Sequence, residues 1–200
     1  MSTLLSLPYL PSVAWMAVFL KSENVWIEAH DNFQKSTSRN RTTIAAANGL
    51  QHLSIPLVGG RDTHRLYGET KISYTENWQK NHWRSIVSAY NRSPFFEHYA
   101  YFFEPFYTQR HEQLFKYNSQ LLNTILQALK ASKEISFTEQ YDVNFYTQDF
   151  RKNEPELNLP RYWQVFEDRN GFQPKVCVLD LIFNLGPQAL AYLSKLEVVP

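Results

Sequence analysis

The segment from His30 to Arg41 combines the residue types that acid–base chemistry and anion binding require. His30 and Asp31 come directly after a short β-branched and aromatic run. Four nitrogen-bearing side chains follow in the same polar stretch: Lys35, Arg39, Asn40 and Arg41. A histidine beside a carboxylate can act as a general base near neutral pH, and the nitrogen-bearing groups can donate to phosphate or carboxylate. The segment therefore predicts a catalytic pair, His30 and Asp31, with substrate-binding side chains beside it.

The alternative interpretation of this segment is an ordinary polar loop with solvated arginines, since short basic clusters are common on protein surfaces. The position of the segment directly after a predicted strand instead favours a ligand-binding site. Ligands of α/β proteins usually bind beyond the carboxyl ends of parallel strands, which is where His30 and Asp31 would project. On a strand, Arg39 and Arg41 would share one face and Asn40 the other, so the arginines converge only where that face borders the site.

His82 is a second candidate, on the apolar face of a predicted helix from Trp78 to Arg92. A histidine in this position is commonly a core residue that makes one hydrogen bond. The functional alternative is a catalytic residue that meets the segment around His30 across a pocket. The sequence leaves both alternatives open.

Asp180 and Asn184 form a third candidate, four residues apart in an otherwise apolar segment. A helix would place both on one face. Burying a carboxylate is costly unless it is paired, so Asp180 needs a partner. The partner could be an arginine, a lysine or backbone N–H groups. With Arg39 or Arg41 as the partner, the pair would be either a structural tie between the two ends of the chain or part of a substrate site.

The first elements predict an N-terminal βαβ unit. Thr3 to Leu7 and Val25 to Ile27 have the composition of strands, and Ser12 can cap a helix from Val13 to Lys21 between them. A connection of this length fits a crossover between parallel strands. No glycine occurs in Pro8-Tyr9-Leu10-Pro11, so the dinucleotide-binding fingerprint is absent, although the helix start at Ser12 could attract an anion.

A hairpin and a helical C-terminal half complete the predicted fold, an α/β class with a mixed sheet in one domain over residues 1–200. The hairpin strands are expected at Thr42 to Ile44 and Leu53 to Val58, around a turn at Asn48-Gly49. Further short strands are expected at Lys71 to Tyr74 and Ile135 to Phe137. Four further helices are expected, at Trp78 to Arg92, Phe95 to Phe106, Glu112 to Ala131 and Gln188 to Leu196. A capping box at Ser73 to Glu76 is expected to begin the first of these, and an N-cap at Ser93 to begin the second. Residues 144–174 are polar and interrupted by prolines, which indicates an irregular excursion.

Composition and missing motifs narrow the function. The chain has 200 residues and a formal charge of +1, so no global field attracts nucleic acid or anionic lipid. The one cysteine, Cys177, lies in an apolar run, and no leader or membrane span is visible; both features predict a cytoplasmic protein. No zinc spacing, phosphate loop or nucleophile elbow occurs. We therefore expect no metal and no cofactor, and direct transfer without a covalent intermediate if the chain is an enzyme.

The residues also resemble a known family, the WbqC-like proteins. The resemblance runs almost from end to end, through these pieces: Pro8-Tyr9-Leu10-Pro11, Lys35 with Arg39-Asn40-Arg41, Ile44, Gly49, Ile55-Pro56, Trp78, His82, Tyr90, Ser93-Pro94-Phe95-Phe96, Gln140-Tyr141, Gly171-Phe172 with Pro174, and Leu179 to Pro187. The chain departs from the family at its start. The family usually has Gln-Pro before the tyrosine and Gly-Tyr-Phe in the first helix, whereas here Leu7 precedes Pro8 and Val18-Phe19 follow Ala17. If that glutamine binds substrate, this chain binds a different ligand or none.

The resemblance implies a place in bacterial O-antigen and surface-polysaccharide biosynthesis, where a role in transferring glycine or another aminoacyl group to a sugar has been suggested for the family. The partners would then be a sugar or nucleotide-sugar and an activated amino-acid donor. His30 or His82 would take a proton from the acceptor, and Asp31 would orient the imidazole. Four residues join the basic segment in the substrate-binding set: Tyr9, Tyr90, Asp180 and Asn184.

Two alternatives to this function remain open. The abundant aromatic residues also suit a non-catalytic protein that binds a glycan precursor or scaffolds a biosynthetic enzyme. Single-stranded nucleic acid could stack on tyrosine and arginine, but the near-neutral charge argues against it.

Overall fold

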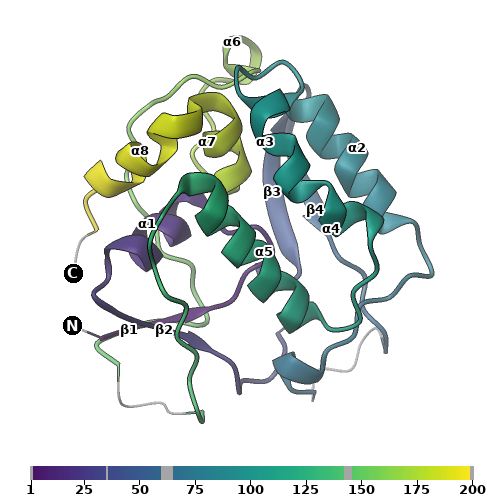
Figure 1. The fold of residues 1–200 in the computed structure, drawn as a ribbon, viewed down its shortest axis with the longest axis vertical. Helices are drawn as coiled ribbons and strands as arrows, with labels where there is room; N and C mark the ends of the chain where they lie inside the picture. Colours follow the sequence, from purple (N-terminus) through teal and green to yellow (C-terminus); the bar gives the residue numbers. More distant parts are fainter. Residues whose placement is uncertain (1, 35, 60–64, 142–145, 199–200) are drawn as a thin grey trace.

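The computed structural model describes residues 2–34, 36–59, 65–141 and 146–198, which form two small β-sheets and the helices that pack against them (Figure 1). The described elements follow one another in this order: β1 (Ser2–Ser6), α1 (Val13–Lys21), β2 (Asn24–Glu28), β3 (Arg41–Ala46), β4 (Gly49–Ser54), η1 (Tyr67–Glu69), α2 (Trp78–Tyr90), α3 (Phe96–Phe103), α4 (Pro105–Thr108), α5 (Leu114–Leu129), β5 (Gln148–Phe150), α6 (Glu167–Asn170), α7 (Val178–Leu185), η2 (Gly186–Gln188) and α8 (Ala189–Lys195). The mixed α/β class predicted from the sequence is confirmed.

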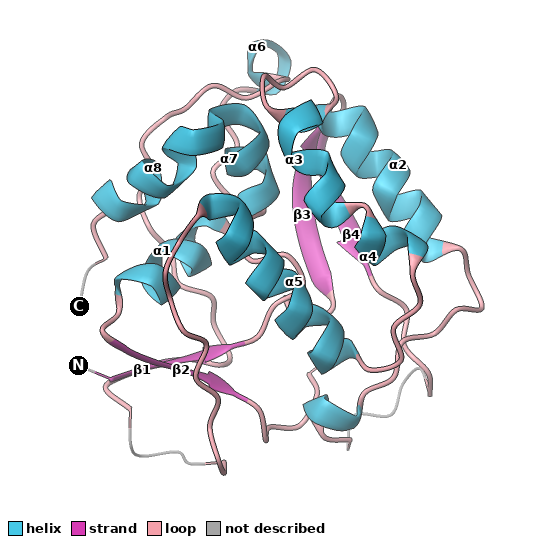
Figure 2. Cartoon of the chain, in the orientation of Figure 1, coloured by secondary structure: helices cyan, strands magenta, loops and turns pink. Residues whose placement is uncertain are grey.

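The N-terminal βαβ unit is present as predicted. β1 runs parallel to β2, from Ser2 opposite Asn24 to Ser6 opposite Glu28, and α1 connects the two strands. Ser12 caps α1, because its Oγ accepts the N–H of Trp15 at 3.2 Å. Figure 2 shows α1 lying between this sheet and the helices α7 and α8.

The third strand of the parallel sheet comes from the stretch predicted to be an irregular excursion. β5 pairs in parallel with the free edge of β1, so the strand order is β2-β1-β5. The short helix α6 also lies within this stretch. Ile135 to Phe137, predicted as a strand, contributes only an isolated parallel bridge between Phe137 and Ile27.

The β-hairpin is confirmed with a different second strand. β3 and β4 are antiparallel, with Ala46 opposite Gly49, so the turn consists of Ala47 and Asn48. β4 therefore begins at Gly49 and ends at Ser54, before Pro56, which has no N–H to donate to a ladder. The strand predicted at Lys71 to Tyr74 is also wrong, since this segment makes isolated bridges only.

The predicted helices are present, but two of their starts differ. The capping box is wrong, because α2 begins after Asn77 and Ser73 instead contacts the hydroxyl of Thr75 at 3.0 Å. Ser93 does not cap α3; its hydroxyl donates to the Tyr90 carbonyl at 2.6 Å and so closes the end of α2. These local polar contacts compete with capping.

The aromatic helix predicted up to Phe106 divides into α3 and α4 at Pro105. Proline lacks the N–H that would continue the helix, and its ring collides with the preceding turn. The two halves of the chain then meet in one apolar core that contains side chains of α1, α5 and α7. Gly186 closes α7 with φ 51° directly against the ring of Phe95, whose N–H donates to the Phe183 carbonyl at 3.0 Å. No helix in the described ranges has the length and apolar character that a membrane crossing requires.

Candidate functional site

The carboxyl ends of two parallel strands, β2 and β5, border a polar cavity of about 550 Å³. We call it the carboxyl-edge cavity. It is lined by residues that follow β2, by residues in and after β5, and by Tyr141, which precedes β5. The full lining is His30, Asp31, Asn32, Gln34, Tyr141, Asp149, Arg151, Lys152 and Asn153. This is the edge at which α/β proteins usually bind ligands, and the first half of the segment from His30 to Arg41 lies there as predicted.

A network of charged side chains, buried except for the exposed Asp149, lies at this cavity. Its members are Glu28, Asp31, Arg39, Asp149 and Arg151. The Arg151 guanidinium donates to Asp149 at 2.6 to 3.0 Å and to Glu28 Oε2 at 3.1 Å. Because a buried charge without a partner is costly, these pairings allow the charges to remain inside the fold. Three carboxylates face two guanidinium groups in the network.

Asp31 and Arg39 form an ion pair inside this network, and their side chains are only 6 % and 1 % exposed. Arg39 also donates to the Arg151 carbonyl at 3.2 Å. Burial raises the pKa of Asp31, while the Arg39 guanidinium works in the opposite direction. The second carboxylate oxygen, Oδ1, is covered by protein and has no hydrogen-bond partner among the described residues. Arg39 therefore has a structural role: it holds Asp31 and the Arg151 backbone in place beneath the cavity. Its side chain is too deeply buried to bind substrate.

His30 is exposed at the cavity and is held in place by two residues. Its ring Nε2 lies 3.0 Å from the Thr138 carbonyl, and its backbone N–H donates to Glu28 Oε1 at 2.8 Å. The same Glu28 oxygen accepts the Thr138 hydroxyl at 2.8 Å. A carbonyl only accepts, so Nε2 carries the proton in the neutral ring and Nδ1 is left as an acceptor. The predicted orientation of His30 by Asp31 is wrong, because Asp31 binds Arg39 instead.

The rest of the basic segment spreads to different places. Asn40 donates to the Ile55 carbonyl at 3.0 Å and fixes the loop before the hairpin. Arg41 is exposed at the start of β3 and lines a second cavity of about 270 Å³. Arg39 and Arg41 thus point to different environments. Lys35 lies outside the described residues.

Tyr9 and His82 lie together in the core, away from the carboxyl-edge cavity. The Tyr9 hydroxyl is 3.0 Å from His82 Nδ1 and 2.9 Å from the Tyr107 hydroxyl. Burial lowers the pKa of His82 to about 4, with a smaller opposing effect from the backbone of Ser54. His82 is therefore neutral at pH 7 and has the setting of a core histidine. Of the two alternatives that the sequence left open, this setting favours the core histidine, and His82 does not line the cavity that contains His30.

One carboxylate oxygen of Asp180, Oδ1, has neutral partners instead of an arginine, and the other, Oδ2, is buried without a hydrogen-bond partner among the described residues. Its Oδ1 accepts from the Tyr162 hydroxyl at 2.7 Å and from Gln164 Nε2 at 2.9 Å, and Asn184 Nδ2 donates to its backbone carbonyl at 2.8 Å. The predicted ion pair with Arg39 or Arg41 is therefore wrong. Burial raises the pKa of Asp180 to about 6, which these hydrogen bonds partly oppose.

Tyr90, the remaining predicted ligand, is also structural in its setting. Its hydroxyl accepts the N–H of Ala45 at 3.2 Å, which ties the end of α2 to β3. The described residues contain no group of three or more histidine, cysteine, aspartate and glutamate side chains that could hold a metal ion.

Comparison with known proteins decides the family. The WbqC-like protein family matches residues 8–147, more than half of the chain. The chain belongs to the WbqC-like protein family. A curated relative, "Uncharacterized protein Rv1507c" of Mycobacterium tuberculosis (strain ATCC 25618 / H37Rv), is 29% identical over 195 residues, covering 80% of this chain and 83% of the relative. No solved structure matches the chain.

The WbqC-like match covers only part of the cavity lining. His30 and Tyr141 lie inside residues 8–147, whereas Asp149 and Arg151 lie beyond them. Sequence reasoning missed both of the latter, because they belong to a stretch without periodicity. Glu28, which accepts the His30 N–H, could have been recognised from the sequence as an acidic residue at the end of an apolar strand. Tyr141 was part of the resemblance, but no role was assigned to it.

Proposed function

We propose that the chain is an acyl or aminoacyl transferase of bacterial surface-polysaccharide (O-antigen) biosynthesis, with a sugar or nucleotide-linked sugar as acceptor in the carboxyl-edge cavity. One observation carries the proposal. An exposed histidine, His30, lines a polar cavity at the ligand-binding edge of a parallel sheet, and its Nε2 is held by the Thr138 carbonyl. This contact leaves Nδ1 free to accept a proton from a ligand.

The hydrogen bond to Thr138 suits a base in this position, because an Nε2–H donor on a charged ring makes a stronger, charge-assisted bond to the carbonyl. Asp31 does not supply this contact, since its carboxylate pairs with Arg39.

The reaction we propose is direct transfer. His30 Nδ1 takes the proton of an acceptor hydroxyl or amine while the acceptor oxygen or nitrogen bonds to the carbonyl carbon of an activated amino-acid donor. The bond between that carbon and the leaving group breaks, and the leaving group departs with the electron pair. The proton then passes from His30 to the leaving group. The polar lining supplies hydrogen-bond partners for sugar hydroxyls, among them Asn32 and Gln34.

Turnover of nucleotide-linked sugars with glycyl thioesters as donors tests the function. We expect product with the wild-type chain, and a fall in kcat of about 10²-fold or more in His30→Ala, because general-base catalysis contributes on this scale. The matched control is His98→Ala, since His98 is exposed on α3 and does not line the cavity. Equal kcat in wild type and His30→Ala would remove His30 from the mechanism.

A second candidate function is non-catalytic binding of a glycan precursor. The side chain of Tyr141 favours it, because this ring is half exposed at the cavity and stacks under the Arg151 guanidinium, 4.6 Å from the ring centre. Such a preformed aromatic surface suits a sugar ring without any chemistry. Under this alternative, Tyr141→Ala weakens sugar binding and His30→Ala leaves it unchanged, with no turnover by the wild type.

A further inference from the structure

A second cavity lies beside the first and is lined by cations and hydroxyl groups. The loop from Ser36 to Ser38 forms one wall, and the other walls carry Arg41, His52 and Lys175. A third hollow of about 660 Å³ has lining residues in common with each of the two cavities. It shares Lys152 and Asn153 with the carboxyl-edge cavity, and it shares Ser12, Glu154 and Lys175 with the second cavity. The third hollow therefore adjoins both cavities, and the segment from His30 to Arg41 contributes residues to each of them.

The loop from Ser36 to Ser38 presents donors that the protein does not use. The backbone N–H groups of Ser36, Thr37 and Ser38 donate to no acceptor within the described chain. The hydroxyls of Ser36 and Ser38 likewise make no hydrogen bond there. Ser36 has φ 57°, and consecutive N–H groups around a left-handed residue form the concave arrangements that bind anions.

The start of α1 offers fewer free donors than the loop. The Val13 N–H donates to the Val176 carbonyl at 3.4 Å, and the Trp15 N–H donates to Ser12 Oγ at 3.2 Å. The Ala14 N–H donates to no acceptor among the described residues. That this helix start attracts an anion stays a prediction.

The cations of the second cavity are available to a ligand. Arg41 makes no ion pair with any described residue. Lys175 pairs with Glu156 at 2.9 Å, but both side chains are more than three-quarters exposed, so the pair is weak and easily exchanged. Glu154, which also lines the cavity, opposes an anion.

We infer that the second cavity binds the phosphate group of a phosphate-linked sugar, with Arg41, Lys175 and the Ser36–Ser38 loop as its ligands. This inference rests on the proposed function in one respect, namely that the sugar of the same molecule occupies the carboxyl-edge cavity. A phosphate has several anionic oxygens directed to different sides, which matches donors that approach from a loop, a strand and a separate segment. A carboxylate offers two oxygens in one plane and fits this arrangement less well.

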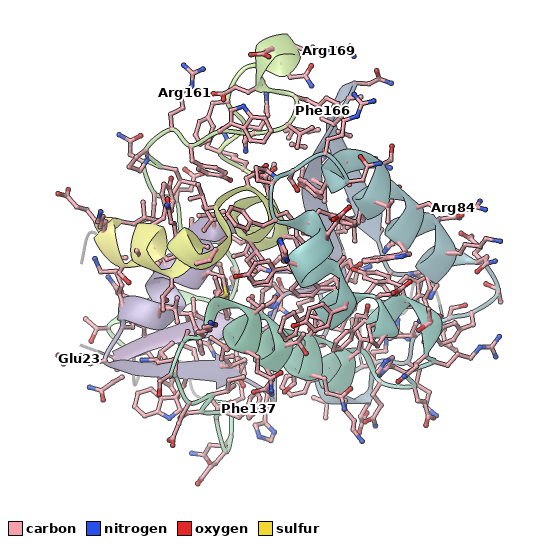
Figure 3. All side chains as sticks on the ribbon, turned by 45° about the horizontal axis from the view of Figure 1, so that its top comes forward. Glu23, Arg84, Phe137, Arg161, Phe166 and Arg169 are labelled. Atoms are coloured by element: carbon pink, nitrogen blue, oxygen red, sulfur yellow. The ribbon has the colours of Figure 1, made fainter. Side chains whose placement is uncertain are left out.

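Binding of inorganic pyrophosphate, measured by isothermal titration calorimetry, tests the inference. We expect Arg41→Gln and Lys175→Gln each to weaken binding by about tenfold or more, the scale of one charge-assisted contact. The matched control is Arg84→Gln, since Arg84 points outward from α2 at the edge of the molecule in Figure 3 and lies in none of the three hollows. Acetate at the same concentration should compete poorly.

The outcomes separate the phosphate site from the proposed reaction. Equal pyrophosphate affinity in wild type, Arg41→Gln and Lys175→Gln overturns the phosphate site, whatever the turnover. Stronger competition by acetate than by inorganic phosphate overturns it as well. Unchanged kcat in His30→Ala, together with tenfold weaker pyrophosphate binding in Arg41→Gln, refutes the reaction and supports the site. Comparing uridine diphosphate with dodecyl phosphate then assigns the phosphate to a nucleotide or a lipid, whichever binds more tightly.

Discussion

Arg39 Nη2 donates to Asp31 Oδ2, eight positions earlier in the chain, and this ion pair is almost entirely shielded from solvent. The pair fixes the loop that borders both cavities, because the carbonyl of Arg39 also accepts from Asn118 Nδ2 at 2.7 Å on α5. Removing one partner leaves the other as an unpaired buried charge, which costs more than the pair itself contributes. Arg39 therefore affects the site through the fold of the loop.

Arg39→Met should lower the free energy of unfolding by about 3–5 kcal/mol, the usual cost of breaking a buried ion pair. The control is Arg41→Met, whose exposed position should limit the change to about 0.5 kcal/mol. The double variant Asp31→Asn/Arg39→Met should recover part of the loss, because no charge is then left unpaired. Urea denaturation monitored by circular dichroism measures all three. Equal stability of Arg39→Met and Arg41→Met would contradict a structural role of the buried Arg39–Asp31 pair.

Gly186→Ala should destabilise the protein more than Gly171→Ala. Both glycines have positive φ, 51° and 69°, so each substitution incurs the left-handed backbone cost of about 1–2 kcal/mol. At Gly186 an added Cβ would also lie 2.5 Å from the ring of Phe95, whereas at Gly171 nothing lies within 4 Å. Overpacking of this kind adds about 1–3 kcal/mol. The difference in thermal stability between the two variants measures the cost of the overlap with Phe95. Equal losses of stability would show that the Phe95 ring moves aside.

Tyr9→Phe should cost about 1–3 kcal/mol, because it leaves His82 Nδ1 and the Tyr107 hydroxyl without their shared partner in the core. Tyr101→Phe is the matched control, since that side chain is 62% exposed. Chemical denaturation compares the two. Loss of less than about 0.5 kcal/mol in Tyr9→Phe would mean that water replaces the hydroxyl.

The parts of the fold that follow from local pattern could be predicted from the sequence. The helix after Ser12 and the two strands around it have clear apolar patterns, and their parallel pairing follows from the length of the connection. β5 has no such pattern. Its three residues, Gln148 to Phe150, become a strand only because they pair with β1, more than a hundred residues away in the chain.

The candidate site could likewise be predicted only in part. That the segment from His30 to Arg41 borders cavities follows from its place after a parallel strand. The partner of each side chain does not follow, because it depends on distant residues. Glu28 and Arg151 are separated by 123 positions, and Thr138 reaches His30 from a segment that was predicted as a separate strand. Whether the chain is one domain stays a prediction.

The pH dependence of stability should reveal two opposing buried groups. Asp180 has a pKa of about 6 in the folded state, above its usual 3.8, so the folded chain binds more protons and stability falls as pH rises from about 4 to 6. His82 has a pKa of about 4, below its usual 6.5, so the unfolded chain binds more protons and stability rises with pH from about 4 to 6.5. In the wild type the two slopes largely cancel.

Asp180→Asn should expose the His82 contribution, and His82→Gln should expose that of Asp180. Each shift corresponds to roughly 3 kcal/mol when fully expressed. The stability of Asp180→Asn should therefore rise by about that amount between pH 4 and 6.5, while the stability of His82→Gln should fall between pH 4 and 6. Urea unfolding at half-unit pH steps gives both profiles. All other titrating groups are common to the two variants, so the difference between the profiles reports these two residues alone, and parallel profiles would contradict the buried titrations of both.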